Sequence, residues 1–117
     1  MNDITVKALY ASVVEDEGHI FIGFAEGEGE EDPYALFRQP LGGGPVWFEV
    51  SDESLGAEDA VESVTLSDKG LEIVIAAAKA AKVGWARSIA VRIGPQTESA
   101  DEALAALREM LGDRFRG

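Results

Sequence analysis

The chain has 117 residues, no cysteine, and 22 acidic against 10 basic residues, which gives a net charge of −12. This length fits a single domain, and the 46% hydrophobic content excludes a disordered chain. Without cysteine, a disulfide framework, a thiolate metal site and a cysteine nucleophile are all excluded. No apolar run approaches the roughly 18 residues that a membrane span requires, and no basic or apolar leader follows Met1. We therefore expect a cytoplasmic protein that does not bind membranes.

The acidic residues crowd into the first half of the chain. Between Glu15 and Glu62 there are fourteen carboxylates and one base, Arg38, which is a local charge of −13. The rest of the chain holds eight acids and nine bases. A concentrated negative field attracts basic surfaces and repels nucleic acid, whose phosphates are bound by lysine and arginine. The sequence therefore predicts a basic protein as the partner and argues against nucleic acid.

The first third of the chain predicts a hairpin followed by a loop. Residues 4–10 alternate between the two faces of a strand, residues 15–18 form a turn, and residues 19–25 resume the alternation. Residues 26–33 are almost entirely glycine and acid, so they are expected to form a solvated loop.

The next segments predict two strands and a second acidic loop. Residues 34–39 and 46–51 have strand patterns, and Pro40 and the glycine-rich turn after it separate them. In the second of these strands, one face is expected to carry Trp47 and Glu49, and the opposite face Val46, Phe48 and Val50. Residues 52–59 are expected to be an acidic loop.

The second half predicts three more strands and two helices. Strands are expected at 61–67, 71–75 and around 89–93, with a tight turn at 68–70 and a short alanine-rich helix at 76–83. The C-terminal helix is expected to begin at a capping box of Ser99 and Glu102 and to stop at Gly112. Its core face would carry Leu104, Leu107 and Leu111, with Met110 beside it.

Together these elements predict one α+β domain over residues 1–112 and a short tail over residues 113–117. The domain would be a mostly antiparallel sheet of six to seven short strands, with the C-terminal helix packed on one face and solvent on the other.

No catalytic or metal-binding pattern stands out. A lone histidine such as His19 is usually structural, and the serines lack a nucleophile-elbow context. The acids around Gly56 do not follow the spacing of a calcium-binding loop, although weak calcium binding stays open. The run Gly42-Gly43-Gly44 lacks the lysine of a phosphate loop. We expect no enzyme activity, no cofactor and no metal.

Aromatic residues beside the acidic loops are typical of an interface with a basic protein. Phe37 is expected in the core, Trp47 on the surface and Trp85 at the edge of the core. The candidate partner-binding residues are Glu26, Glu28, Glu30, Glu31, Asp32, Tyr34, Trp47, Asp52, Glu53, Glu58 and Asp59.

The block from Val46 onward resembles a known family. Val46-Trp47-Phe48-Glu49-Val50, Asp52-Glu53, Val61-Glu62-Ser63-Val64-Thr65-Leu66-Ser67 and Leu71-Glu72-Ile73 resemble the tenth numbered immunity-protein family of bacterial polymorphic toxin systems. That family favours an Asp-Gln pair where this chain has Asp52-Glu53. The resemblance implies an inhibitor that binds and neutralises a cognate toxin in the cytoplasm of the producing cell, without catalysis of its own.

Two alternatives stay open at this point. A small acidic secretion chaperone would have similar size and charge, and a dimer with a long apolar groove would favour it. A ligand-binding or enzymatic domain would require a deep pocket holding a desolvated carboxylate or His19.

Overall fold

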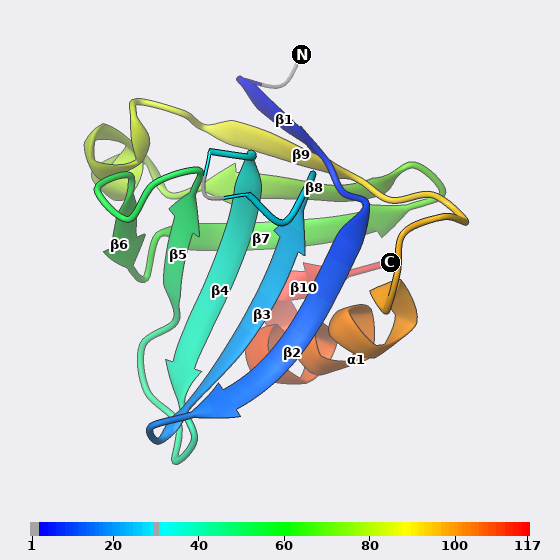
Figure 1. Ribbon diagram of the computed structural model, residues 1–117. Helices are drawn as coiled ribbons and strands as arrows, with labels where there is room; N and C mark the ends of the chain where they lie inside the picture. Colours follow the sequence, from blue (N-terminus) through cyan, green and yellow to red (C-terminus); the bar gives the residue numbers. More distant parts are fainter. Residues whose placement is uncertain (1–2, 30) are drawn as a thin grey trace.

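A computed structural model describes residues 3–29 and 31–117, and these residues form two five-stranded sheets with a C-terminal helix (Figure 1). The first sheet, the meander sheet, has the spatial order β2 (Tyr10–Asp16), β3 (His19–Ala25), β4 (Tyr34–Pro40), β5 (Trp47–Val50) and β6 (Gly56–Glu58). The second sheet, the mixed sheet, has the order β1 (Ile4–Lys7), β9 (Ser88–Arg92), β8 (Gly70–Ile75), β7 (Val61–Ser67) and β10 (Phe115–Arg116). The helices are the 3₁₀ helix η1 (Ala77–Val83), the α-helix α1 (Ala100–Leu111) and the 3₁₀ turn η2 (Gly112–Arg114).

The α+β class and the C-terminal helix are confirmed, but the expectation of one sheet was wrong. The segment predicted as a single strand at 4–10 divides between the sheets. Its first part, β1, runs parallel to β9, whereas Tyr10 begins β2, which pairs antiparallel with β3. Apolar residues alternate through both strands without a break. The sequence pattern therefore does not show that β1 and β2 pair with strands of different sheets.

Two short strands lie where loops were expected. β6 occupies part of the predicted acidic loop at 52–59 and pairs with β5. β10 lies in the predicted tail and pairs with β7, and its Phe115 is buried. The guanidinium of Arg108 lies 4.5 Å from the centre of the Phe115 ring, which ties this end of the chain to α1.

The core lies between the two sheets and beneath α1. The meander sheet contributes three fully buried phenylalanines, Phe24, Phe37 and Phe48. The ring centres of Phe24 and Phe37 are 6.5 Å apart, and those of Phe37 and Phe48 are 5.0 Å apart, which is the usual range for aromatic pairs. The core position expected for Phe37 is confirmed.

Helix α1 packs its buried residues Ala103, Leu107 and Leu111 against the inner side of the meander sheet at β2 and β3. The predicted capping box is absent, because Ser99 adopts a left-handed conformation (φ 61°) and makes no side-chain capping bond. The segment before the helix is held instead by Thr97, whose hydroxyl donates to the carbonyl of Ala8 at 2.8 Å.

Candidate functional site

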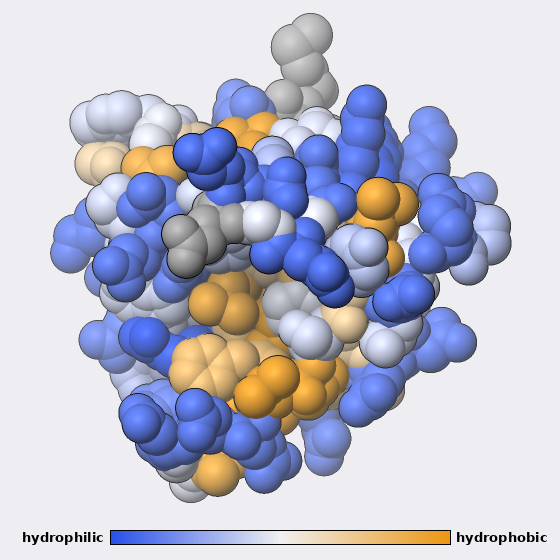
Figure 2. Space-filling model, viewed as in Figure 1, coloured by the Kyte–Doolittle hydropathy of each residue, from blue (hydrophilic) through white to orange (hydrophobic). Residues whose placement is uncertain are grey.

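The outward side of the meander sheet, which we call the open face, carries half-buried and exposed side chains between the buried ones of each strand. Phe21 of β3 lies opposite Val14 of β2 and Arg38 of β4, and Arg38 lies opposite Trp47 of β5. Val14 is 51% exposed. Hydrophobic side chains gather in the middle of this face and hydrophilic ones surround them (Figure 2). An apolar patch with a polar rim is typical of a protein-binding surface.

A nearly buried carboxylate, Glu49, lies at one side of this patch. Glu49 is only 6% exposed, although it stands on the outward side of β5 as its alternation predicted. The indole nitrogen of Trp47 donates to its Oε1 at 2.8 Å, and the hydroxyl of Tyr34 donates to its Oε2. Hydrogen bonds to an ionised group are about twice as strong as neutral ones, so this network fixes both aromatic side chains.

Gly56 provides the space in which the Trp47 indole lies. A Cβ atom at Gly56 would stand 2.7 Å from Cζ2 of Trp47 and 2.8 Å from Cβ of Glu49, closer than real contacts. On the neighbouring strand, the guanidinium of Arg38 lies 5.0 Å from the Trp47 ring centre, in the range of a cation–π interaction. Arg38, the one base of the acidic half, therefore contacts an aromatic side chain within the open face.

The electrostatic environment follows from these contacts. Burial, and then the hydrogen bond to Glu49, raise the pKa of Tyr34 far above its usual value of 10.0, and the charges of Asp52 and Glu53 act in the same direction. The backbone N–H of Ser54 donates to Asp52 at 2.8 Å and lowers the pKa of that exposed carboxyl. Tyr34 therefore remains a neutral donor at any physiological pH.

The fold brings the two predicted acidic loops to the same end of the meander sheet. The loop after β3 and the loop after β5 leave the same end because successive strands run antiparallel. Tyr34 lies between them, and its carbonyl accepts a hydrogen bond from the Ser51 N–H at 2.9 Å. A shallow hollow of about 410 Å³ is lined at this end by Tyr34, Glu49, Ser51, Asp52 and Glu53.

Two carboxylates between β3 and β4, those of Glu26 and Asp32, accept backbone hydrogen bonds. The N–H of Gly29 donates to Asp32 at 2.9 Å, and the backbone N–H of Lys7 donates to Glu26 at 2.9 Å. Glu28 and Glu31 are exposed. Glu30 lies outside the described residues.

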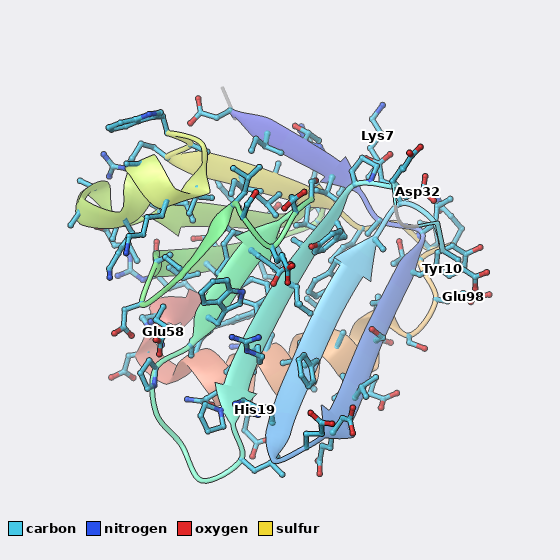
Figure 3. The ribbon with its side chains drawn as sticks, turned by 60° about the vertical axis from the view of Figure 1, so that its left-hand side comes forward. Lys7, Tyr10, His19, Asp32, Glu58 and Glu98 are labelled. Atoms are coloured by element: carbon cyan, nitrogen blue, oxygen red, sulfur yellow. The ribbon has the colours of Figure 1, made fainter. Side chains whose placement is uncertain are left out.

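Glu58 and Asp59 lie apart from these loops. Glu58 is on the edge strand β6, opposite Trp47, and Asp59 follows it. Figure 3 shows Glu58 and Asp32 at opposite margins of the open face. The predicted acids therefore surround the aromatic centre and do not form one cluster.

Several residues of the face were not predicted as partner-binding. The sequence predicted only which face of its strand Glu49 lies on. The hydrogen bond between Glu49 and Tyr34 depends on the register of β4 and β5, which one sequence does not reveal. Gly56 was read only as a loop residue. Phe21 and Leu36 had a usable signal, because each alternates with core residues of its strand.

Trp85 was expected at the edge of the core, and this was wrong: it is 76% exposed. Its backbone is left-handed (φ 65°). His19 is half-buried, and its Nδ1 lies 3.2 Å from the carbonyl oxygen of Glu17 in the adjoining turn.

Within residues 3–29 and 31–117, no group of three or more histidine, aspartate or glutamate side chains is arranged to hold a metal ion. Across the same part of the chain, no helix has the length and apolar character needed to cross a membrane.

None of the protein families, curated proteins or solved structures compared with the chain matches it. The family resemblance therefore stays an expectation, and the surface of the chain is the evidence for its function.

Proposed function

We propose that the chain is a non-catalytic binding protein that neutralises a basic protein toxin in the cytoplasm of the cell that makes both. The observation that carries the proposal is the open face, in which Tyr34 and Trp47 are fixed around Glu49 and surrounded by acidic loops.

The fixed aromatic pair supports a binding role. Tyrosine and tryptophan dominate the energetics of protein interfaces, and side chains that are already ordered lose little entropy on binding. The indole of Trp47 donates a hydrogen bond to Glu49, packs against Gly56 and lies beside the guanidinium of Arg38. Tyr34 and Trp47 are therefore already ordered in the free protein, which lowers the entropic cost of binding a partner.

The charge distribution indicates which partner fits. Neither acidic loop contains a base within its own sequence. A negative rim accelerates encounter with a positive surface and opposes encounter with a negative one. Nuclease toxins present basic surfaces because they bind phosphates, so an inhibitor of this charge could cover their substrate site.

The chemistry of Glu49 favours binding over catalysis. A general acid or base needs a free position directed at substrate, whereas both oxygens of Glu49 accept hydrogen bonds from the protein. In this proposal the carboxylate serves to position the aromatic side chains.

The test is bacterial growth when the product of the adjacent gene is expressed alone and together with this chain. We expect the neighbour to stop growth and the chain to restore it. If the neighbour is harmless, or the chain gives no protection, the proposal fails.

A matched pair of variants locates the binding surface. Val14→Arg places a cation on the open face, where it would repel a basic partner, and should abolish protection. Thr65→Arg places the same side chain on the exposed outer side of the mixed sheet and should leave protection unchanged. Equal protection by both variants would exclude the open face as the binding surface.

A further inference from the structure

Trp85 stands at a position that neither burial nor backbone preference explains. Its side chain is 76% exposed, the most exposed large hydrophobic residue of the described chain. Its φ of 65° lies in the left-handed region, which is uncommon for a bulky residue and is the conformation that glycine adopts without strain. Glycine would adopt this backbone without strain, so the presence of tryptophan calls for a reason other than the turn itself.

The turn that carries Trp85 is held by backbone hydrogen bonds and by buried neighbours. The backbone N–H of Trp85 donates to the carbonyl of Ala80 at 2.7 Å, and the backbone N–H of Ala86 donates to the carbonyl of Val83 at 3.1 Å. Val83 and Ala86 are themselves buried. The exposed indole of Trp85 is therefore attached to a backbone that its own hydrogen bonds and buried neighbours hold in place.

The segment that carries Trp85 is basic in sequence, and in space Asp3 lies against it and accepts hydrogen bonds from the backbone N–H groups of Arg87 and Ser88 at 2.7 and 3.1 Å. Residues 73–97 contain four bases and no acid, in a chain whose net charge is −12. Lys82 and Arg87 are exposed and Lys79 is half-buried. We call residues 77–87 the basic turn.

The basic turn lies directly beside an acidic loop, residues 51–55 (Figure 1). A Cβ atom on Gly84 would lie 3.6 Å from Cδ2 of Leu55, so the two segments are in contact. Asp52 and Glu53 of that loop are exposed. A positive and a negative surface thus adjoin at the same end of the molecule.

We infer that the basic turn binds a second copy of the chain. Two adjacent patches of opposite charge are self-complementary, because a two-fold axis between them places each patch against its opposite on the other copy. In such a dimer each Trp85 meets the acidic loop of the other copy, and both contacts form at once. A nucleic acid or an anionic membrane could meet the basic turn only, because neither offers a basic surface to the acidic loop at 51–55.

The dimer should be weak and sensitive to salt. One tryptophan buries about 150–250 Å², whereas a standard interface buries about 1,600 Å² in total. Charge pairs at such a rim are screened within about 10 Å at 0.1 M salt. The dimer shares the acidic loop at 51–55 with the proposed toxin-binding surface, but its test requires this chain alone, so either proposal can fail without the other.

Sedimentation velocity on the wild-type chain, from about 10 μM to 1 mM, should show a monomer–dimer equilibrium that weakens at high salt. Trp85→Gly should weaken dimerisation at least about tenfold, because it removes the central aromatic side chain from both halves. Leu41→Ser removes a 53% exposed apolar side chain elsewhere and should leave the dimer unchanged. A chain that stays monomeric at about 1 mM and low salt would overturn the inference.

A charge exchange tests the pairing itself. Lys79→Glu with Lys82→Glu makes both patches acidic, and Asp52→Asn with Glu53→Lys makes the acidic loop basic. Each double variant should be monomeric alone, and the mixture should form a heterodimer. If either variant dimerises as wild type does, or the mixture stays monomeric, the two patches are not partners.

Discussion

Replacing Tyr34 by phenylalanine tests the network on which the open face depends. The variant removes one of the two donors to Glu49, whose carboxylate is only 6% exposed. A hydrogen bond to a charged group is worth about 1.5–3 kcal/mol, and an unpaired buried acceptor costs its desolvation. Because the phenol edge is half-exposed and water can enter, we expect a loss near the lower value, about 1.5–2 kcal/mol of unfolding free energy.

The loss should depend on Glu49. In a Glu49→Ala background no buried carboxylate remains, so Tyr34→Phe should cost less than about 0.5 kcal/mol. Urea unfolding of the four proteins, followed by circular dichroism, gives the coupling energy directly. An equal cost in both backgrounds would refute the proposed role of the network.

The same variant should change the response to alkali. Because the pKa of Tyr34 is higher in the folded than in the unfolded chain, the unfolded state loses its proton first as the pH rises above about 10. The unfolding free energy then falls with pH, by at most about 1.4 kcal/mol per unit and by less for a partly exposed phenol. Tyr34→Phe should lack this contribution, and a wild-type chain equally stable at pH 9 and pH 11 would contradict the assignment.

Three further variants test particular positions. Gly56→Ala should cost about 1–3 kcal/mol and move the indole of Trp47, which unfolding and tryptophan fluorescence would detect; an unchanged spectrum would contradict the close approach. Trp85→Gly should raise the unfolding free energy by up to about 1 kcal/mol, because the strain of a left-handed tryptophan outweighs the extra conformational freedom that glycine gives the unfolded chain. A clear decrease of the unfolding free energy in urea would show instead that the indole stabilises its own fold. Glu28→Lys with Glu31→Lys should change stability by less than about 0.5 kcal/mol in the same assay, because both side chains are exposed.

Much of the fold was predictable because strand periodicity is a local property. The inward residues of β4 and β5 and the hairpin of β7 and β8 follow directly from alternation and turn chemistry. Division into two sheets was not predictable, since it depends on which strand each segment pairs with. β10 was missed because two residues are too few to show a period.

The candidate site was predictable in composition and not in arrangement. The aromatic residues and acids were identified from their positions in the sequence, but the joint role of Tyr34 and Trp47 depends on Glu49 and on register. The exposure of Trp85 was not predicted because the residue lies in a left-handed turn after η1, and sequence alone favours glycine or asparagine at such a position.

Hydrogen exchange on the chain, alone and with the product of the adjacent gene, tests the central claim most directly. If the open face binds the partner, the loop amides at 26–29 and 51–55 and the outer edge of the meander sheet should exchange more slowly in the complex. The loop amides at 68–69 of the mixed sheet should exchange at unchanged rates. Protection confined to the mixed sheet, or no protection anywhere, would contradict the account.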